Sequence, residues 1–137
     1  MKNNSLSDLL NLARKAQTKA LAPYSNFPVG AVLETKSGKL YTGCNIEVSS
    51  YGLTICAERV AMFKALSEGE SEFTRLVVTA NTRELCPPCG ACRQVLLEYA
   101  PDLKLILLNS QGKTKETTIA ALLPEAFNKD FLENRDI

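Results

Sequence analysis

The sequence predicts a three-layer α/β/α sandwich, in which a mixed five-stranded sheet lies between helices. Segments with helical periodicity alternate with short apolar runs, the order typical of this fold class. Two of these runs, residues 75–80 and 103–108, are apolar almost throughout, as expected for strands covered on both faces. With 137 residues, 45% of them hydrophobic, and no recognisable linker, residues 1–137 are expected to form a single domain.

The first part of the chain is predicted to form a helix and then a hairpin. Ser5 and Asp8 have the spacing of a capping-box-type helix start. Apolar residues then recur at helical spacing, and Ala22-Pro23 is expected to end this helix. The turn sequence Lys36-Ser37-Gly38 separates two strand-like segments, residues 29–35 and 39–44.

The second part alternates helices with strands. Residues 56–67 and 89–99 read as helices, closed by Glu68-Gly69 and by Pro101. The buried strands 75–80 and 103–108 follow them, and residues 109–112 turn the chain toward a last strand. That strand and the short helical turn before Pro124 are expected at residues 115–118 and 119–123. No pattern decides between helix and coil for the tail from Phe127 onward.

Composition narrows the possible partners and location. The formal net charge is +1, so the chain has no strong basic field to hold a nucleic acid. No apolar stretch is long enough to cross a bilayer, and residues 1–5 lack the apolar region of a signal peptide. Five cysteines, an odd number, favour a reducing compartment and metal or catalytic use over disulfides. We therefore expect a cytoplasmic protein that does not bind membranes.

Two cysteine motifs predict a metal site in a chain without histidine. Cys56 begins one predicted helix, and Cys89 and Cys92 lie on the first turn of another. Free backbone N–H groups and the positive end of the helix dipole therefore point toward the thiolates at both places. Three thiolate ligands would hold one Zn²⁺ per chain and leave the fourth tetrahedral position for water, as in catalytic zinc sites.

Glu58, two residues after Cys56, is the predicted catalytic residue. A carboxylate at this spacing can take a proton from water and return it to a substrate. Three thiolates give a site with Zn²⁺ a net negative charge, which the two helix N-termini and the guanidinium of Arg59 could offset.

The fourth nearby cysteine leaves two other interpretations open. If Cys86 also bound the metal, four thiolates would form a closed structural zinc module without catalytic activity. Pro87 and Pro88 disfavour the turn that this requires. Cys86 and Cys89 also have the spacing of a redox motif, although such motifs normally follow the first strand of their domain. Cys44, at a predicted strand end, is expected to be a small buried residue.

The motifs together resemble the cytidine deaminase family in its three-cysteine zinc form. The resemblance covers nearly the whole chain and rests on these segments: Tyr24-Ser25-Asn26-Phe27-Pro28-Val29-Gly30-Ala31, Gly43-Cys44-Asn45-Ile46-Glu47, Ile55-Cys56-Ala57-Glu58-Arg59, Pro88-Cys89-Gly90-Ala91-Cys92, Cys92-Arg93-Gln94-Val95 and Leu122-Leu123-Pro124. It implies hydrolytic deamination of cytidine and deoxycytidine to uridine and deoxyuridine. It also implies a homotetramer with active sites near the subunit interfaces.

The resemblance also implies substrate-binding roles. Asn45 and Glu47 match residues that hydrogen-bond the ribose, Phe27 matches a residue lining the nucleoside pocket, and the backbone of Ala57 matches a contact to the base.

Two further aromatic residues match less closely. Phe127 is the candidate for a ring that stacks on the pyrimidine from a neighbouring subunit, and Tyr51 resembles a tyrosine of the pocket region. Ordinary structural explanations stay open: Phe27 and Phe127 could be core aromatics, and Asn45 a turn residue.

The chain departs from the family pattern at two places. Val48-Ser49-Ser50 replaces an Asn-Ala pair, and Cys86-Pro87 replaces a common hydroxyl residue before Pro-Cys. A deaminase of a related aminopyrimidine nucleoside, such as blasticidin S, stays an alternative, although Asn45 and Glu47 favour a free ribose. A deaminase of nucleic-acid bases is disfavoured by the near-neutral charge.

Overall fold

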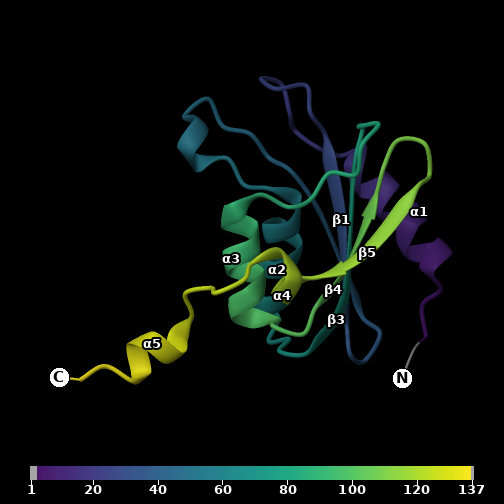
Figure 1. The fold of residues 1–137 in the computed structure, drawn as a ribbon. Coiled ribbons are helices and arrows are strands. Elements are labelled where there is room, and N and C mark those ends of the chain that lie inside the picture. The colour runs from purple at the N-terminus through teal and green to yellow at the C-terminus, as the bar shows by residue number, and fades with distance from the viewer. Residues whose placement is uncertain (1–2, 137) are drawn as a thin grey trace.

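A mixed five-stranded sheet forms the centre of the molecule, as predicted (Figure 1). The computed structural model describes residues 3–136. The strand order is β2-β1-β3-β4-β5, and the β3–β4 pair is parallel whereas the other neighbours are antiparallel. The strands are β1 (Val29–Thr35), β2 (Leu40–Cys44), β3 (Phe73–Ala80), β4 (Lys104–Leu108) and β5 (Thr114–Thr118).

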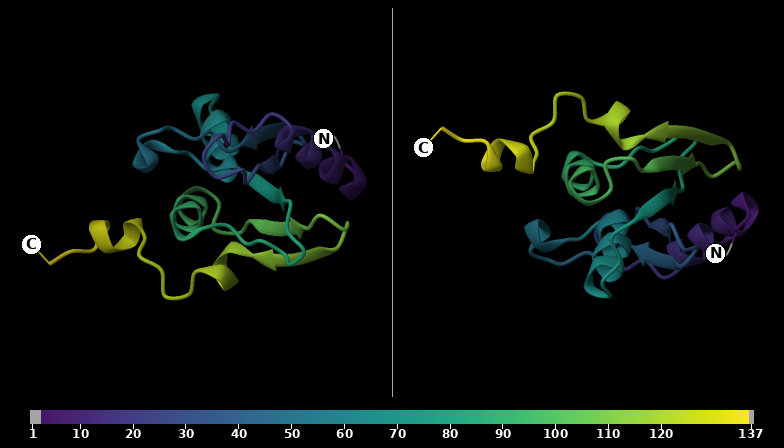
Figure 2. Two further views of the ribbon diagram at one scale, coloured as in Figure 1. Left: turned by 90° about the horizontal axis from the view of Figure 1, so that it is seen from above. Right: turned by 90° about the horizontal axis from the view of Figure 1, so that it is seen from below.

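Helices cover both faces of the sheet and complete the three predicted layers (Figures 1 and 2). Helix α1 (Leu6–Gln17) packs on one face, where its apolar side meets β1 and β3 in a small buried cluster. Helices α2 (Ala57–Ser67) and α3 (Gly90–Tyr99) lie on the other face over the larger core cluster. The short elements are the 3-10 turn η1 (Tyr51–Leu53), α4 (Ile119–Leu122) and α5 (Lys129–Glu133).

The first helix ends earlier than predicted. The Ser5 hydroxyl accepts a hydrogen bond from the Asp8 N–H at 3.1 Å, which supplies one half of the expected capping box. The helix stops at Gln17, five residues before Ala22. The reason is a long-range pairing, because Leu21 donates to the Asn45 carbonyl at 3.0 Å and accepts from the Glu47 N–H at 2.8 Å.

A glycine in β1 lets α1 approach the sheet closely. A Cβ atom at Gly30 would lie 2.1 Å from the carbonyl oxygen of Ala13, so any side chain there would push α1 away. Position 30 therefore needs glycine for packing.

The end of β2 and the C-terminal tail differ from the core in their exposure. Cys44 is half-buried rather than buried, because it ends β2, the edge strand of the sheet. The tail after α4 contains the short helix α5 and extends away from the rest of the molecule (Figure 1). None of the helices in the described residues has the length and apolar character needed to cross a membrane.

Candidate active site

The N-termini of α2 and α3 bring the three predicted cysteines together. Cys56 is the N-cap of α2 and Cys89 the N-cap of α3, while Cys92 lies in the first turn of α3 and is fully buried. Their sulfur atoms all lie within 4.8 Å of one another. Two helix dipoles therefore point their positive ends at one cluster of thiols.

The cluster has the dimensions of a zinc site. Tetrahedral ligands at a Zn–S distance of about 2.3 Å are separated by about 3.8 Å. The Sγ atoms of Cys56 and Cys89 are 3.7 Å apart, which fits this geometry. In the described part of the chain the cluster has three members, and Cys86 is not one of them. Three sulfur donors leave one of the four tetrahedral positions of Zn²⁺ without a protein ligand, as in catalytic zinc sites.

Charge around the thiols favours thiolate formation at Cys56. Hydrogen bonding with Cys92, with smaller contributions from Arg59 and Cys89, lowers the pKa of Cys56 to about 5. The same Cys56 contact, together with burial, raises the pKa of Cys92. A nitrogen of the Arg59 guanidinium lies 3.6 Å from the Cys56 sulfur, and the Nε atom of Arg59 is buried without a hydrogen-bond partner. Arg59 therefore lies where the sequence predicted a positive charge beside the thiolates.

Glu58 is a buried carboxyl group in the first turn of α2, with 4% of its surface exposed. Burial, together with a smaller effect of the negative charge of Cys56, raises its pKa to about 7. A carboxyl group with a pKa near neutrality can both accept and donate a proton at physiological pH. Burial and the charge of Glu58 also raise the pKa of Cys86, which places Cys86 within electrostatic range of Glu58.

Asn45 fixes the loop that carries Phe27. The buried Asn45 side chain accepts from the Val29 N–H at 2.9 Å and donates to the Phe27 carbonyl at 2.8 Å. Phe27 is 39% exposed, so it is not a core aromatic. Asn45 is thus more than a turn residue, because its side chain holds the backbone on both sides of Pro28.

Glu47 binds the start of the same loop. Its carboxylate accepts hydrogen bonds from the Tyr24 N–H at 3.0 Å, from the Ser25 N–H at 3.1 Å and from the Ser25 hydroxyl. The Ser25 hydroxyl, followed by these two amides, lowers the pKa of Glu47, so the group is ionised. No role was predicted for Ser25, although the motif Tyr24-Ser25-Asn26-Phe27 in the sequence contains it.

A two-residue backbone pairing joins this loop region to the cysteines. Ile46 and Ile55 exchange two N–H···O hydrogen bonds, both 3.0 Å long, in an isolated antiparallel bridge. Asn45 and Glu47 flank one side of the bridge, and Cys56 follows the other side directly. The structure therefore holds the predicted sugar-binding segment beside a predicted metal ligand.

Of the remaining predicted substrate-binding residues, Ala57 is buried at the start of α2 and Tyr51 is exposed beside a cavity. Ala57 is fully buried as the first residue of α2, where a helix leaves its backbone N–H without an intrahelical acceptor. Tyr51 is 72% exposed, and its ring centroid lies 5.7 Å from that of Tyr24. A cavity of about 330 Å³ is lined by Tyr24, Ser25, Glu47, Tyr51 and Thr54.

Phe127 lies on the tail and not in the core. Its ring is 58% exposed and stacks on Phe131 with the ring centroids 5.8 Å apart. Its carbonyl accepts a hydrogen bond from the Gln94 side chain at 2.7 Å, which ties the start of the tail to α3.

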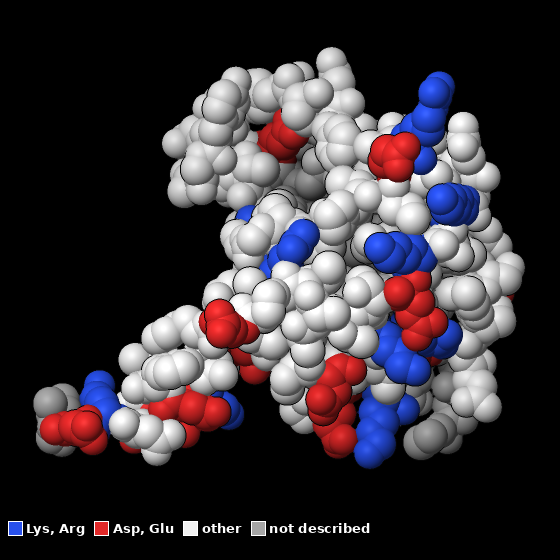
Figure 3. Space-filling model, viewed as in Figure 1, with Lys and Arg blue, Asp and Glu red and all other residues white. Residues whose placement is uncertain are grey.

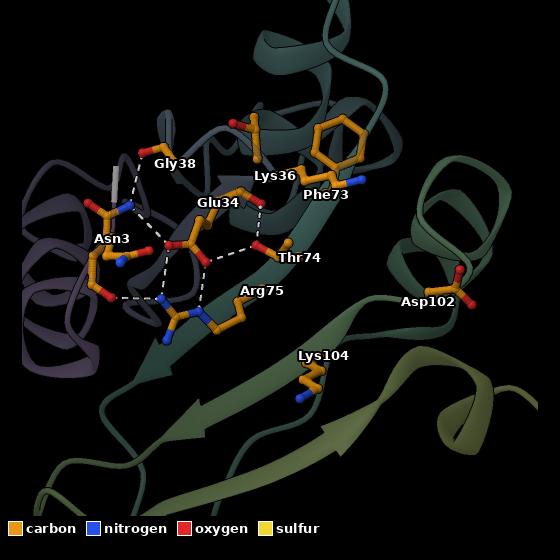
Figure 4. A pocket seen from close by; sticks show the side chains of 11 residues that line it. Asn3, Glu34, Lys36, Gly38, Phe73, Thr74, Arg75, Asp102 and Lys104 are labelled. Atoms are coloured by element: carbon orange, nitrogen blue, oxygen red, sulfur yellow. Dashed lines mark hydrogen bonds and ion pairs between the residues drawn. The ribbon is translucent and has the colours of Figure 1, made fainter. Parts of the chain in front are cut away.

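A second cavity, of about 620 Å³, lies around an ion pair that stabilises the fold and not around the cysteine cluster (Figure 4). Its charged centre is the pair of Arg75 and Glu34, joined by two hydrogen bonds of 2.7 and 2.9 Å. Thr74 and Asn4 also donate to the Glu34 carboxylate, at 2.8 and 3.0 Å. These groups satisfy one another and attach the segment before α1 to the sheet, and the cavity lining contains no cysteine.

Charged side chains of both signs intermix on the face drawn in Figure 3. They are densest over the sheet side of the molecule and along the tail, and single charged side chains of both signs also lie over the helices. This face has no continuous basic surface of the kind that follows a phosphate backbone.

Comparison with known proteins identifies the family. Residues 3–108 match the family model described as cytidine and deoxycytidylate deaminase zinc-binding region. A cytidine deaminase of Sporosarcina psychrophila is 49% identical over 125 residues, covering 90% of this chain and 92% of the relative. The crystal structure of cytidine deaminase from Burkholderia pseudomallei superposes with a TM-score of 0.88 at 47% identity, covering 90% of this chain and all of that one.

A relative with a different named activity is less similar. A blasticidin-S deaminase of Bacillus cereus is 32% identical over 110 residues, covering 74% of this chain and 78% of the relative. Family model, relatives and fold agree with the geometry of the cysteine cluster. The chain therefore belongs to the cytidine and deoxycytidylate deaminase family.

Proposed function

We propose that this protein catalyses the zinc-dependent hydrolytic deamination of cytidine and deoxycytidine, producing uridine or deoxyuridine and ammonia. The observation that carries the proposal is the joint position of three sulfur atoms within 4.8 Å of one another and the buried carboxyl group of Glu58 beside them. The named activity of a relative 49% identical over most of the chain supports the choice of cytidine as substrate.

Cys56, Cys89 and Cys92 are the proposed ligands of one zinc ion per chain. Zinc bound there supplies Lewis-acid activation of a water molecule, which becomes a nucleophile near neutral pH. Arg59 and the two helix N-termini offset the excess negative charge of three thiolates.

Glu58 is the proposed residue for both proton transfers of the reaction. As water attacks C4 of the pyrimidine, the Glu58 carboxylate accepts the proton that the water loses and passes it to N3. Glu58 then takes a second proton, from the hydroxyl now bonded to C4, and delivers it to the amino group as the C4–N bond breaks, so the product has a carbonyl at C4 and the amino group leaves as ammonia. Burial of the carboxyl group limits the exchange of these protons with bulk water.

The loop and bridge segment provide the proposed nucleoside contacts. Asn45 and Glu47 bind a ribose hydroxyl, Phe27 forms a wall of the pocket, and the backbone of Ala57 contacts the base. Asn45 has hydrogen-bonding capacity left for this purpose, because an amide group has two N–H donors and two acceptor lone pairs, and one of each is used on the loop. Tyr51 lines the neighbouring cavity with Glu47.

We infer a homotetramer with active sites near the subunit interfaces, located in the cytoplasm, in which residues 1–137 act as one domain. Exposed apolar surface supports the assembly: a groove of about 540 Å³ is lined by Ile46, Val48, Leu53, Ile55, Val60 and Phe63, with Lys64 and Ser67 at its edge. The exposed ring of Phe127 is the proposed contact to the pyrimidine of a neighbouring subunit. Sedimentation velocity of the purified protein tests the assembly.

The direct test of function is a spectrophotometric assay of zinc-loaded protein with cytidine, deoxycytidine, cytosine and blasticidin S. We expect turnover of the two nucleosides and none of the free base. Turnover of blasticidin S alone would support the alternative that the Bacillus cereus relative suggests. No turnover of any nucleoside would contradict the enzymatic proposal and favour a non-catalytic zinc module.

A further inference from the structure

The first turns of α3 contact the C-terminal segment through two consecutive side chains. The Arg93 guanidinium donates from one nitrogen to the Leu122 carbonyl at 2.8 Å, and the Gln94 amide donates to the Phe127 carbonyl at 2.7 Å. Since Cys92 precedes Arg93 directly, these contacts start beside a proposed zinc ligand.

Arg93 also holds the backbone on both sides of Cys89. Its Nε atom donates to the Pro88 carbonyl at 2.8 Å, and its backbone N–H donates to the Cys89 carbonyl at 3.0 Å. Pro88 is buried, and Cys89 has the extended conformation of a helix N-cap. The Arg93 side chain therefore fixes the carbonyl before the Cys89 Cα atom, and the ordinary helical bond of the residue 93 backbone fixes the carbonyl after it, so the backbone that carries the sulfur is held on both sides.

The other end of the Arg93 bridge is the point where the tail leaves the core. Leu122 is the last residue of α4, so its carbonyl has no intrahelical donor and needs a partner from outside the helix. The Leu122 side chain packs against the larger core cluster, and the following residues lead to the exposed ring of Phe127.

We propose that Arg93 is a positioning residue that couples the placement of Cys89 to the placement of the C-terminal segment 122–127. A planar guanidinium can donate to two carbonyl groups in different directions at once, whereas a lysine ammonium on a flexible stem cannot hold both in one geometry. The proposal rests on the assignment of Cys89 as a zinc ligand. It adds that retention of the metal depends on the contact between Arg93 and the Leu122 carbonyl at the end of α4.

The test compares Arg93→Lys with two other variants of the zinc-loaded 137-residue protein. The readouts are the rate of zinc release to a chromogenic chelator and hydrogen exchange of the amides in residues 88–92 and 122–127. Loss of an outer-shell contact typically lowers metal affinity by about 10- to 100-fold, so Arg93→Lys should release zinc at least about tenfold faster. Exchange should rise in both segments.

Arg14→Lys is the matched control, because Arg14 also donates from its guanidinium to a backbone carbonyl, that of Asn109 at 3.1 Å, on the opposite face of the sheet. It should leave zinc release unchanged. Gln94→Leu removes only the hydrogen bond to the Phe127 carbonyl and leaves the Arg93 contacts in place. It should raise hydrogen exchange in residues 122–127 without changing the rate of zinc release.

Two results would overturn the proposal. One is that Arg93→Lys releases zinc at the wild-type rate, and the other is that Arg93→Lys and Gln94→Leu increase the rate of zinc release equally. If Arg93→Lys does not fold, Arg93→Gln, which keeps one donor group, is measured in the same way with the same criteria. Neither readout uses substrate, so failure here stays separate from failure of the deaminase assay.

Discussion

Gly43 of β2 lies directly against Ala57 of α2. A Cβ atom at Gly43 would be 2.2 Å from the Ala57 carbonyl oxygen and 2.7 Å from the Ala61 nitrogen. The strand and the first turn of the helix therefore touch through backbone atoms. Because Cys56 and Glu58 belong to the start of this helix, the contact with β2 fixes the position of both residues relative to the sheet.

Substitution of Gly43 by alanine should damage the site and the fold together. The added methyl group has no space, so the first turn of α2 must move away from β2. Overpacking of this kind costs about 1 to 3 kcal/mol of unfolding free energy. Urea unfolding measures this loss. The value of kcat/KM for cytidine should also fall more than about tenfold, because a small displacement of catalytic groups greatly slows a reaction.

Gly52→Ala is the control for Gly43→Ala, because a Cβ atom at Gly52 meets no atom within 4 Å. Its unfolding free energy should stay within about 0.5 kcal/mol of wild type. Equal stability of Gly43→Ala and wild type would contradict the close contact.

Removal of the Glu58 carboxylate should separate metal binding from catalysis. Glu58→Gln keeps the size of the side chain but cannot accept a proton, so turnover should fall by about 10²- to 10⁴-fold. Zinc content should stay at one ion per chain, because the three sulfur donors are intact. Metal analysis and cytidine turnover on the same sample check both parts, and substantial activity of the variant would remove Glu58 from the mechanism.

The cysteines should divide into ligands and non-ligands. Cys89→Ala removes a member of the sulfur cluster and should lose zinc and stability together, because metal binding is coupled to folding. Cys86→Ala is the matched comparison from the same loop and should keep one zinc per chain. Loss of zinc by Cys86→Ala would instead indicate the closed four-thiolate module.

Local motifs made much of the fold and the proposed site predictable. Cys56, Glu58, Cys89 and Cys92 stand at helix starts, and a helix start fixes the direction of its first side chains whatever the rest of the chain does. The order of the elements along the chain and the layers followed from alternating periodicity, which also depends on neighbours in sequence.

Contacts between distant segments could not be predicted in this way. The end of α1 was misplaced because Leu21 pairs with the backbone of residues 45 and 47, a partner that no local signal reveals. The same holds for Arg93, which contacts Leu122 across 29 positions. The role of Ser25 as a donor to Glu47 likewise depends on the Leu21 pairing, which brings the two segments together.

The pair of Glu34 and Arg75 should make stability depend on pH in the acid range. Hydrogen bonding to Arg75 lowers the pKa of Glu34 from 4.5 to about 2. A depressed pKa in the folded state adds stability above the unfolded value, near pH 4.5, and this stability is lost as the pH falls toward 2. Glu34→Gln should therefore lower the free energy of unfolding by about 2 kcal/mol at pH 7, a value that allows for the partial exposure of Arg75. The stabilities of the variant and the wild type should converge near pH 2.

Glu72→Gln is the control, because its ion pair with Lys36 has both side chains about two-thirds exposed and should contribute little at any pH. Urea unfolding at several pH values measures the difference, and a Glu34→Gln deficit that stayed constant down to pH 2 would show that the pair stabilises the fold through packing and not through charge.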